Sequence, residues 1–91
     1  MQGETREIRL KRLRMRSMRR GIKEMDLILG GYSDQHLDGM DAEMLDLYER
    51  LLEENDQDLY QWVSGQVAAP APYGELVAEI ALGADGIVRP A

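Results

Sequence analysis

Cysteine is absent from the sequence, and histidine occurs only once among its 91 residues, as His36. Without cysteine the chain has no disulfide framework, no thiolate metal site and no cysteine nucleophile. One histidine is too few for a multi-histidine metal site, and it leaves serine–histidine chemistry poorly supplied. This inventory argues against an enzyme. We expect the chain to hold no metal and no cofactor of its own.

Long apolar runs are also missing. No segment approaches the ~20 consecutive apolar residues that a membrane-spanning helix needs, and the N-terminus lacks the continuous apolar stretch of a secretory signal. Its arginines mildly resemble an organellar transit peptide, but Glu4 and Glu7 count against that interpretation. We therefore expect no membrane partner. The absence of cysteine suits a reducing compartment, and the location that we expect is the bacterial cytoplasm.

The length and the charge distribution limit the architecture and the partners. A chain of 91 residues forms one small domain without room for a large internal cavity. We predict a single helical domain over residues 1–83 and a loose tail over residues 84–91. Residues 1–23 carry a net charge of +7 and residues 24–91 a net charge of −13. The overall acidity disfavours nucleic acid as a partner, although the basic arm keeps that class open.

Apolar residues recur at spacings of three and four almost throughout, and no alternating pattern indicates a strand. The fold class is therefore predicted to be all-α, a compact bundle of five short helices. Their expected ranges are residues 5–17, 21–32, 41–54, 59–64 and 73–82.

Local signals refine these helices. Gly30 and Gly31 should weaken or end the second helix, because an interior glycine costs ~1 kcal/mol relative to alanine. Asp41 is the predicted N-cap of the third helix. Tyr48 and Trp62 lie on apolar stripes of the third and fourth helices, and we expect both side chains in the core.

The charge changes sign across residues 19–32, whose sequence is RRGIKEMDLILGGY. Arg20 and Glu24 stand four residues apart, so a helix would place them side by side. Gly21 lacks a side chain, so another backbone could approach closely there. A plainer interpretation is a surface ion pair worth ~0.3–0.5 kcal/mol, with Gly21 marking a junction between helices.

This segment resembles the Arg-Gly-x-x-Glu signature of the SdhE family of small assembly factors. A second similar block covers residues 48–53, YERLLE, and continues through residues 56–62, DQDLYQW. The two blocks have the family's order and spacing, and the resemblance extends over residues 8–65. Gln57 departs from the pattern, because the family often has proline there.

The resemblance implies a function. Members of the family promote covalent attachment of flavin to the flavoprotein subunit of succinate dehydrogenase or fumarate reductase. The implied partner is that flavoprotein, which carries the FAD, and the free chain is expected to be a monomer. The implied client-binding residues are Arg19, Arg20, Gly21, Glu24 and Asp26. Arg20 would donate hydrogen bonds to the client, and Glu24 would orient Arg20 or accept a bond from the client.

Two other classes of function stay open. One is a module that binds nucleic acid or an anionic surface through the basic helix of residues 6–20; it predicts binding that weakens steeply with salt. The other is a small helical adaptor with an unrelated partner, which predicts no association with a flavoprotein and no particular sensitivity at Gly21.

Overall fold

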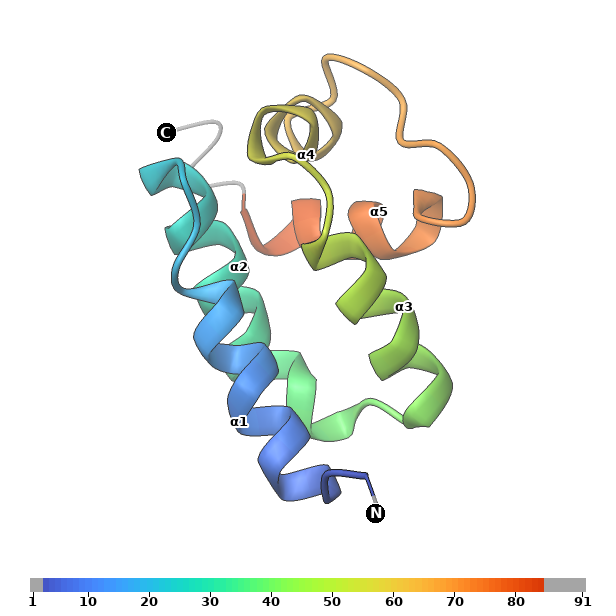
Figure 1. Ribbon diagram of the computed structural model, residues 1–91. Coiled ribbons are helices and arrows are strands. Elements are labelled where there is room, and N and C mark those ends of the chain that lie inside the picture. The colour runs from blue at the N-terminus through green and yellow to red at the C-terminus, as the bar shows by residue number, and fades with distance from the viewer. Residues whose placement is uncertain (1–2, 85–91) are drawn as a thin grey trace.

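Every regular element in residues 3–84, the range that the computed structural model describes, is a helix (Figure 1). The elements are α1 (Arg6–Ser17), α2 (Lys23–His36), the short 3₁₀ helix η1 (Leu37–Gly39), α3 (Ala42–Leu52), α4 (Asp56–Val63) and α5 (Gly74–Gly83). The predicted all-α bundle of five helices is confirmed. The predicted tail lies outside the described residues except for Ala84, which is buried.

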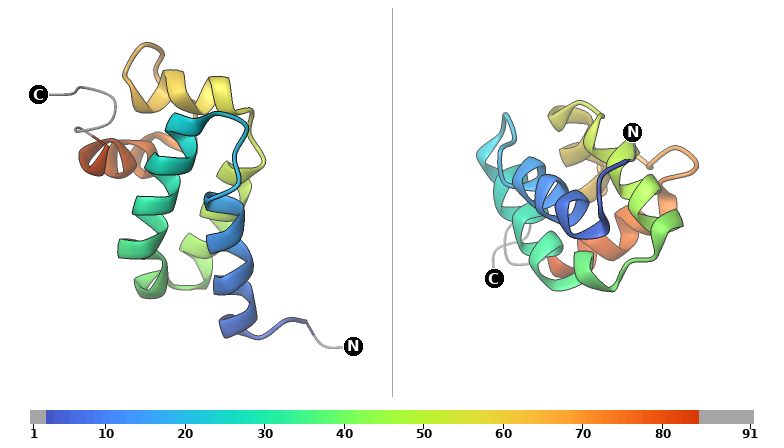
Figure 2. Two further views of the ribbon diagram at one scale, coloured as in Figure 1. Left: turned by 90° about the vertical axis from the view of Figure 1, so that its left-hand side faces the viewer. Right: turned by 60° about the horizontal axis from the view of Figure 1, so that its bottom comes forward.

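The first three α-helices lie side by side and alternate in direction. α1 and α2 run side by side in opposite directions, and α3 returns beside α1 (Figures 1 and 2). α4 lies across the end of the bundle where α1 ends and α2 begins, and α5 packs on α2 and α4. The connection between α1 and α2 therefore meets the junction between α3 and α4, although 30 or more residues separate them in the sequence.

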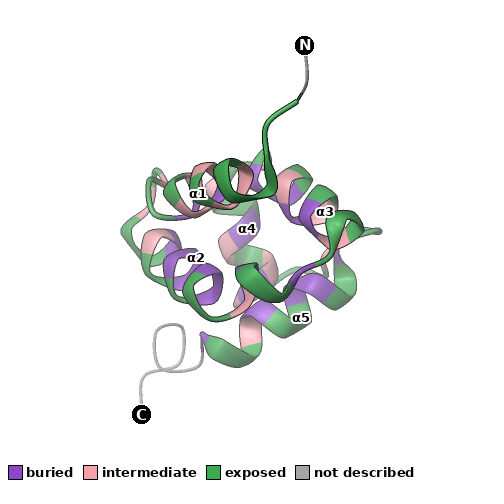
Figure 3. Cartoon of the chain, turned by 90° about the horizontal axis from the view of Figure 1, so that it is seen from below, coloured by how far each residue is buried: buried purple, intermediate pink, exposed green. Residues whose placement is uncertain are grey.

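The core is apolar and comes mainly from α2, α3 and α5 (Figure 3). Tyr48 lies at its centre, as predicted, and its hydroxyl is 2.6 Å from the Ser17 hydroxyl of α1. Burial raises the pKa of Tyr48 to about 12. Trp62 is only half-buried, and its ring stacks on that of Tyr73 at a centroid distance of 5.9 Å. The prediction of a core position is therefore wrong for Trp62, which lies at the edge of the core.

α1 is attached to the fold mostly by polar contacts. Leu13 and Ser17 are its only buried residues. Its arginines face a row of acids on α3 and at its C-cap, with nitrogen–oxygen distances of 2.6–3.0 Å. We call this set the α1–α3 seam; it consists of Arg9, Arg12 and Arg16 on α1 with Asp46 and Glu49 on α3 and Glu53, the C-cap residue of α3.

Most predicted helix boundaries hold, and the exceptions have local causes. Asp41 is the N-cap of α3, as predicted, and its carboxylate accepts from the Met44 N–H at 2.9 Å. α4 begins at Asp56, three residues earlier than expected, because the Asn55 side chain caps it by accepting from the Gln57 N–H at 2.8 Å. Each cap satisfies a backbone donor that a helix start leaves free.

The predicted end of the second helix at Gly30 and Gly31 is wrong, because α2 continues through both residues to His36. Gly30 is buried, and a Cβ placed on it would lie only 3.3 Å from the Met18 Cγ. The missing side chain thus lets the end of α1 pack closely on α2. Tertiary packing of this kind overrides the weak local preference of glycine against helix.

No helix within residues 3–84 combines the length and the apolar character that crossing a membrane requires.

Candidate functional site

Arg20 and Gly21 lie in the connection between α1 and α2, not in a helix. The predicted pairing of Arg20 with Glu24 is therefore not formed, because α2 begins only at Lys23 and the helical spacing does not apply. Arg20 points instead toward the start of α4, where its Nε donates to the Asp56 Oδ1 at 2.7 Å. The Arg20 side chain is 9% exposed and that of Asp56 is 16% exposed, so this ion pair is largely shielded from water.

The rest of the Arg20 guanidinium caps the end of α3. Its Nη1 donates to the Leu52 carbonyl at 3.0 Å, and its Nη2 donates to the Glu54 carbonyl at 3.3 Å. The last carbonyls of a helix have no partner within the helix and carry a partial negative charge, so a cation is favourable there. Arg20 is thus satisfied by its own chain through three different partners.

Gly21 takes part in the same arrangement. Its backbone N–H donates to the second carboxylate oxygen of Asp56, and a Cβ on Gly21 would lie 3.1 Å from that oxygen. The close approach expected at this glycine is therefore made by a carboxylate of the same chain. Asp26, in the first turn of α2, accepts a hydrogen bond from the Arg20 N–H. We call Arg20, Gly21, Asp26 and Asp56 the carboxylate clasp.

Arg19 and Glu24 stand outside the carboxylate clasp, and both are exposed. Glu24 forms part of the wall of an open cleft of about 360 Å³ between the start of α2 and α4. The other residues that line this cleft are Ile22, Gln57, Tyr60, Gln61 and Gln66. Most of these residues have polar side chains, namely glutamine amides, the Tyr60 hydroxyl and the Glu24 carboxylate, and Ile22 is the apolar one. The cleft can therefore receive a polar or amphipathic group of a partner.

Of the five predicted site residues, the structure brings Arg20, Gly21 and Asp26 together and leaves Arg19 and Glu24 facing solvent. Asp56 joins the first three, although it is not among the predicted site residues. Its only signal was its place in the second block of resemblance, at a separation of 36 residues from Arg20. Nothing local to residues 19–26 indicates that an acid from another helix holds them.

The electrostatics of α1 also differ from what its composition suggests. Hydrogen bonds from Arg12 and Arg9 hold the pKa of Glu49 below its usual range, in spite of partial burial. Arg14 approaches the Asp34 and Asp38 carboxylates of α2 and η1 at 3.6 and 3.4 Å. Most of the guanidinium groups on this helix are therefore balanced by acids of the same chain.

Known proteins resemble this chain over most of its length. The family described as "Flavinator of succinate dehydrogenase" matches residues 11–82. Curated relatives named "Succinate dehydrogenase assembly factor 2, mitochondrial" include those of Meyerozyma guilliermondii, 45% identical over 62 residues, and Schizosaccharomyces pombe, 40% identical over 67 residues. These alignments cover 68% and 74% of this chain, but 46% and 48% of the relatives. The chain thus spans about half the length of the curated relatives it matches.

These relatives correct one expectation. They are named as mitochondrial and come from fungi, including Debaryomyces hansenii at 40% identity over 62 residues. The prediction of a bacterial cytoplasmic protein is therefore wrong. The absence of cysteine is compatible with more than one compartment.

The family match and the two blocks of sequence agree, and the resemblance to SdhE assembly factors is confirmed. The chain belongs to the family of succinate dehydrogenase flavinators, the SdhE-like assembly factors.

Proposed function

We propose that this chain binds the flavoprotein subunit of succinate dehydrogenase and promotes the covalent attachment of FAD to it. The observation that carries the proposal is the carboxylate clasp, which holds the connection between α1 and α2 in one conformation. The clasp leaves Arg19, Gly21 and Glu24 exposed, and Glu24 lines the cleft. The family description and the printed names of the relatives support the choice of client.

In this proposal the chain acts by binding and is not itself a catalyst. The new bond forms between the flavin and its client, and the chain contributes free energy that favours the attachment-competent arrangement of the client. A rigid surface does this better than a mobile one, since less conformational entropy is lost on docking. The clasp supplies that rigidity, because Asp56 accepts from both Arg20 and Gly21.

The residues of the site then divide into two roles. Arg20 and Asp26 position the connection and are satisfied within the chain. Arg19 and Glu24 contact the client, and the missing side chain of Gly21 gives the Asp56 carboxylate room to hold the connection. This assignment differs from the one that sequence resemblance implies, in which Arg20 itself reaches the client.

The test is covalent flavin on the flavoprotein subunit, read as fluorescence in a denaturing gel. Cells would carry the intact chain, no chain, or the Glu24→Ala variant. We expect the fluorescent band to weaken strongly without the chain and with Glu24→Ala. Glu43→Ala is the matched control. Like Glu24, Glu43 is exposed and is the second residue of its helix, but it lies at the start of α3, away from the carboxylate clasp. An unchanged band in cells without the chain would contradict the proposal.

Binding of nucleic acid or anionic surfaces by α1 is less well supported. The guanidinium groups of Arg9, Arg12, Arg14 and Arg16 already pair with acids at 2.5–3.6 Å. Affinity for a polyanion grows with the number of phosphates that cations neutralise. Paired arginines contribute little to that number, so the basic composition of α1 overstates its attraction for phosphates.

A further inference from the structure

The outer face of α1 carries apolar side chains that the fold does not cover. Ile8 and Met15 are 56% and 42% exposed, although they lie on a helix packed against two others. They stand seven residues apart, two helical turns, and so share one face. Single exposed apolar residues are ordinary, but neighbouring ones on one face commonly mark a contact surface.

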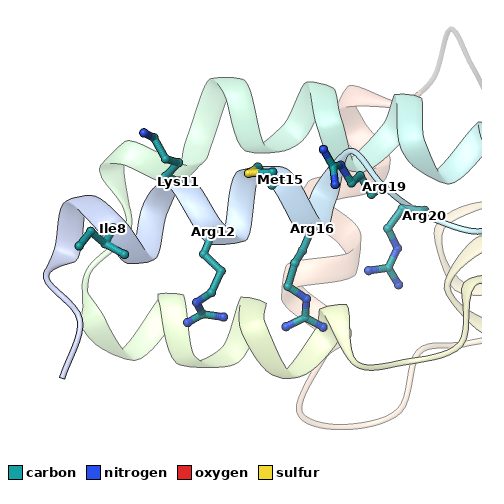
Figure 4. Close-up of a pocket in the computed structure, with 7 residues that line it drawn as sticks. All are labelled: Ile8, Lys11, Arg12, Met15, Arg16, Arg19 and Arg20. Atoms are coloured by element: carbon teal, nitrogen blue, oxygen red, sulfur yellow. The ribbon is translucent and has the colours of Figure 1, made fainter.

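These side chains line a shallow hollow of about 620 Å³ that runs along α1 (Figure 4). Figure 4 shows Arg12, Arg16 and Arg20 extending from it toward α3, whereas Lys11 and Arg19 extend to the other side. Within residues 3–84, neither Lys11 nor Arg19 forms an ion pair with an acid. The outer face of α1 is defined here by Ile8, Lys11, Met15 and Arg19.

The chemistry of this face selects its partner. An apolar floor with unpaired cations at its rim fits a segment that combines apolar side chains with carboxylates. From Ile8 to the end of α1 at Ser17 the face is about 14 Å long, at 1.5 Å per helical residue, and Arg19 extends it into the connection. That length accommodates a short extended segment or about three turns of a helix.

The position of the face connects it with the motif. Arg19 and Arg20, at one end of the hollow, are also the first residues of the motif connection. A stable protein–protein contact uses about 20–30 residues on each side, far more than residues 19–24 provide. An extension of the contact is therefore required, and the outer face of α1 is continuous with the motif.

We infer that the outer face of α1 binds an acidic, apolar segment of the same flavoprotein client, so that docking runs from the motif along α1. This inference rests on the proposed function and deepens it. Two unpaired cations neutralise few phosphates of a nucleic acid or a lipid surface, so they provide little affinity for either. The apolar floor of the hollow makes no favourable contact with a phosphate backbone. A protein segment satisfies both parts of the face.

The test is the affinity of the purified chain for the flavoprotein subunit, measured by isothermal titration calorimetry. The double variant Ile8→Glu/Met15→Glu places carboxylates on the floor of the hollow, and glutamate is a good helix former. We expect binding to weaken about tenfold or more, as for a central contact residue. Leu82→Glu is the matched control, because Leu82 is 80% exposed on α5, and its affinity should equal that of the unchanged chain.

Two further arms separate the possible outcomes. Ile8→Gln/Met15→Gln removes the apolar groups without reversing charge, and thermal unfolding confirms that each variant folds. Undiminished affinity in both folded double variants, with weakened binding by Glu24→Ala, would overturn the inference and leave the proposed function intact. No binding by the unchanged chain would overturn both. Loss of binding to phosphatidylglycerol vesicles or duplex DNA alone, with client affinity retained, would assign the face to a polyanion instead.

Discussion

α1 and α5 are helices of similar length that the fold holds in opposite ways. α1 has twelve residues and buries only Leu13 and Ser17, whereas α5 has ten and buries Leu76, Val77 and Ile80. Seven of the eight ion pairs in the described part of the chain involve an arginine of α1, and none involves α5. One helix is fixed by charge and the other by apolar burial.

The difference explains why α1 can serve as a contact surface. Because the α1–α3 seam attaches α1 through its arginines, the apolar side chains of Ile8 and Met15 on its outer face are not needed for packing and stay exposed. Attachment by exposed charges also depends on pH and salt, since ions screen such pairs. The apolar burial that holds α5 depends much less on pH and salt.

The largest effect is expected where burial holds the helix. Ile80→Ala should lower the free energy of unfolding by about 2–5 kcal/mol, because it removes buried surface and leaves a cavity. Leu82→Ala, on the same helix but exposed, should change it by less than about 0.5 kcal/mol. Unfolding in urea, followed by circular dichroism, measures both. Equal losses in the two variants would show that burial does not distinguish the faces of α5.

A smaller effect is expected in the α1–α3 seam. Glu49 accepts from Arg9 at 3.0 Å and from Arg12 at 2.8 Å. Glu49→Gln should cost about 1 kcal/mol or less at neutral pH, since these side chains are partly exposed. Added salt should reduce this cost, whereas it should leave the cost of Ile80→Ala largely unchanged.

The pH dependence of that cost has a definite sign. The pKa of Glu49 is lowered in the folded chain, chiefly by the hydrogen bond from Arg12. Its contribution is therefore complete above the unfolded value of about 4.3 and is lost as pH falls through the folded value. The difference between the unchanged chain and Glu49→Gln should shrink in acid. Glu43→Gln, which changes an exposed carboxylate on the same helix, is the control, and a difference that persists in acid would contradict the role of charge.

The smallest effect compares two adjacent glycines of α2. A Cβ on Gly31 would meet no atom within 4 Å, so Gly31→Ala should stabilise the chain by about 0.5–1 kcal/mol through helix preference. A Cβ on Gly30 would press on Met18 at the end of α1, so Gly30→Ala should stabilise less or destabilise. Thermal unfolding of both variants measures the contrast. An equal gain at both positions would mean that Met18 moves away from the new Cβ at Gly30 at no cost in free energy of folding.

The helical period was enough to predict the class and number of the helices. The cap at Asp41 was also predictable, because an N-cap side chain bonds to the first turn of its own helix. So was the burial of Tyr48, because the apolar side of an amphipathic helix faces the core. Gly30 was misleading, since its closest contact is with Met18, which precedes it by twelve residues and lies on the other side of a turn. Glycine has a local cost that can be estimated from sequence, whereas its packing advantage depends on the fold.

The candidate site was predictable in its location but not in its connections. Sequence placed Arg20 beside Glu24, and the fold placed it against Asp56. Two short connections meet at that point, and only the packing of α4 across the end of the bundle brings them together. The exposure of Ile8 was likewise unpredictable, because its helical position alone does not show that ion pairs, and not apolar contacts, attach α1 to α3.

The carboxylate clasp also has a consequence for how this family can change over evolutionary time. Asp56 accepts from Arg20 and Gly21 at once, so losing Asp56 leaves two donors without their acceptor, losing Arg20 leaves Asp56 without its ion pair, and a side chain at Gly21 would crowd Asp56. Such positions drift together or not at all. Residues 20, 21 and 56 should therefore vary as one unit among relatives, whereas Arg19, which is exposed outside the clasp, is under no such constraint.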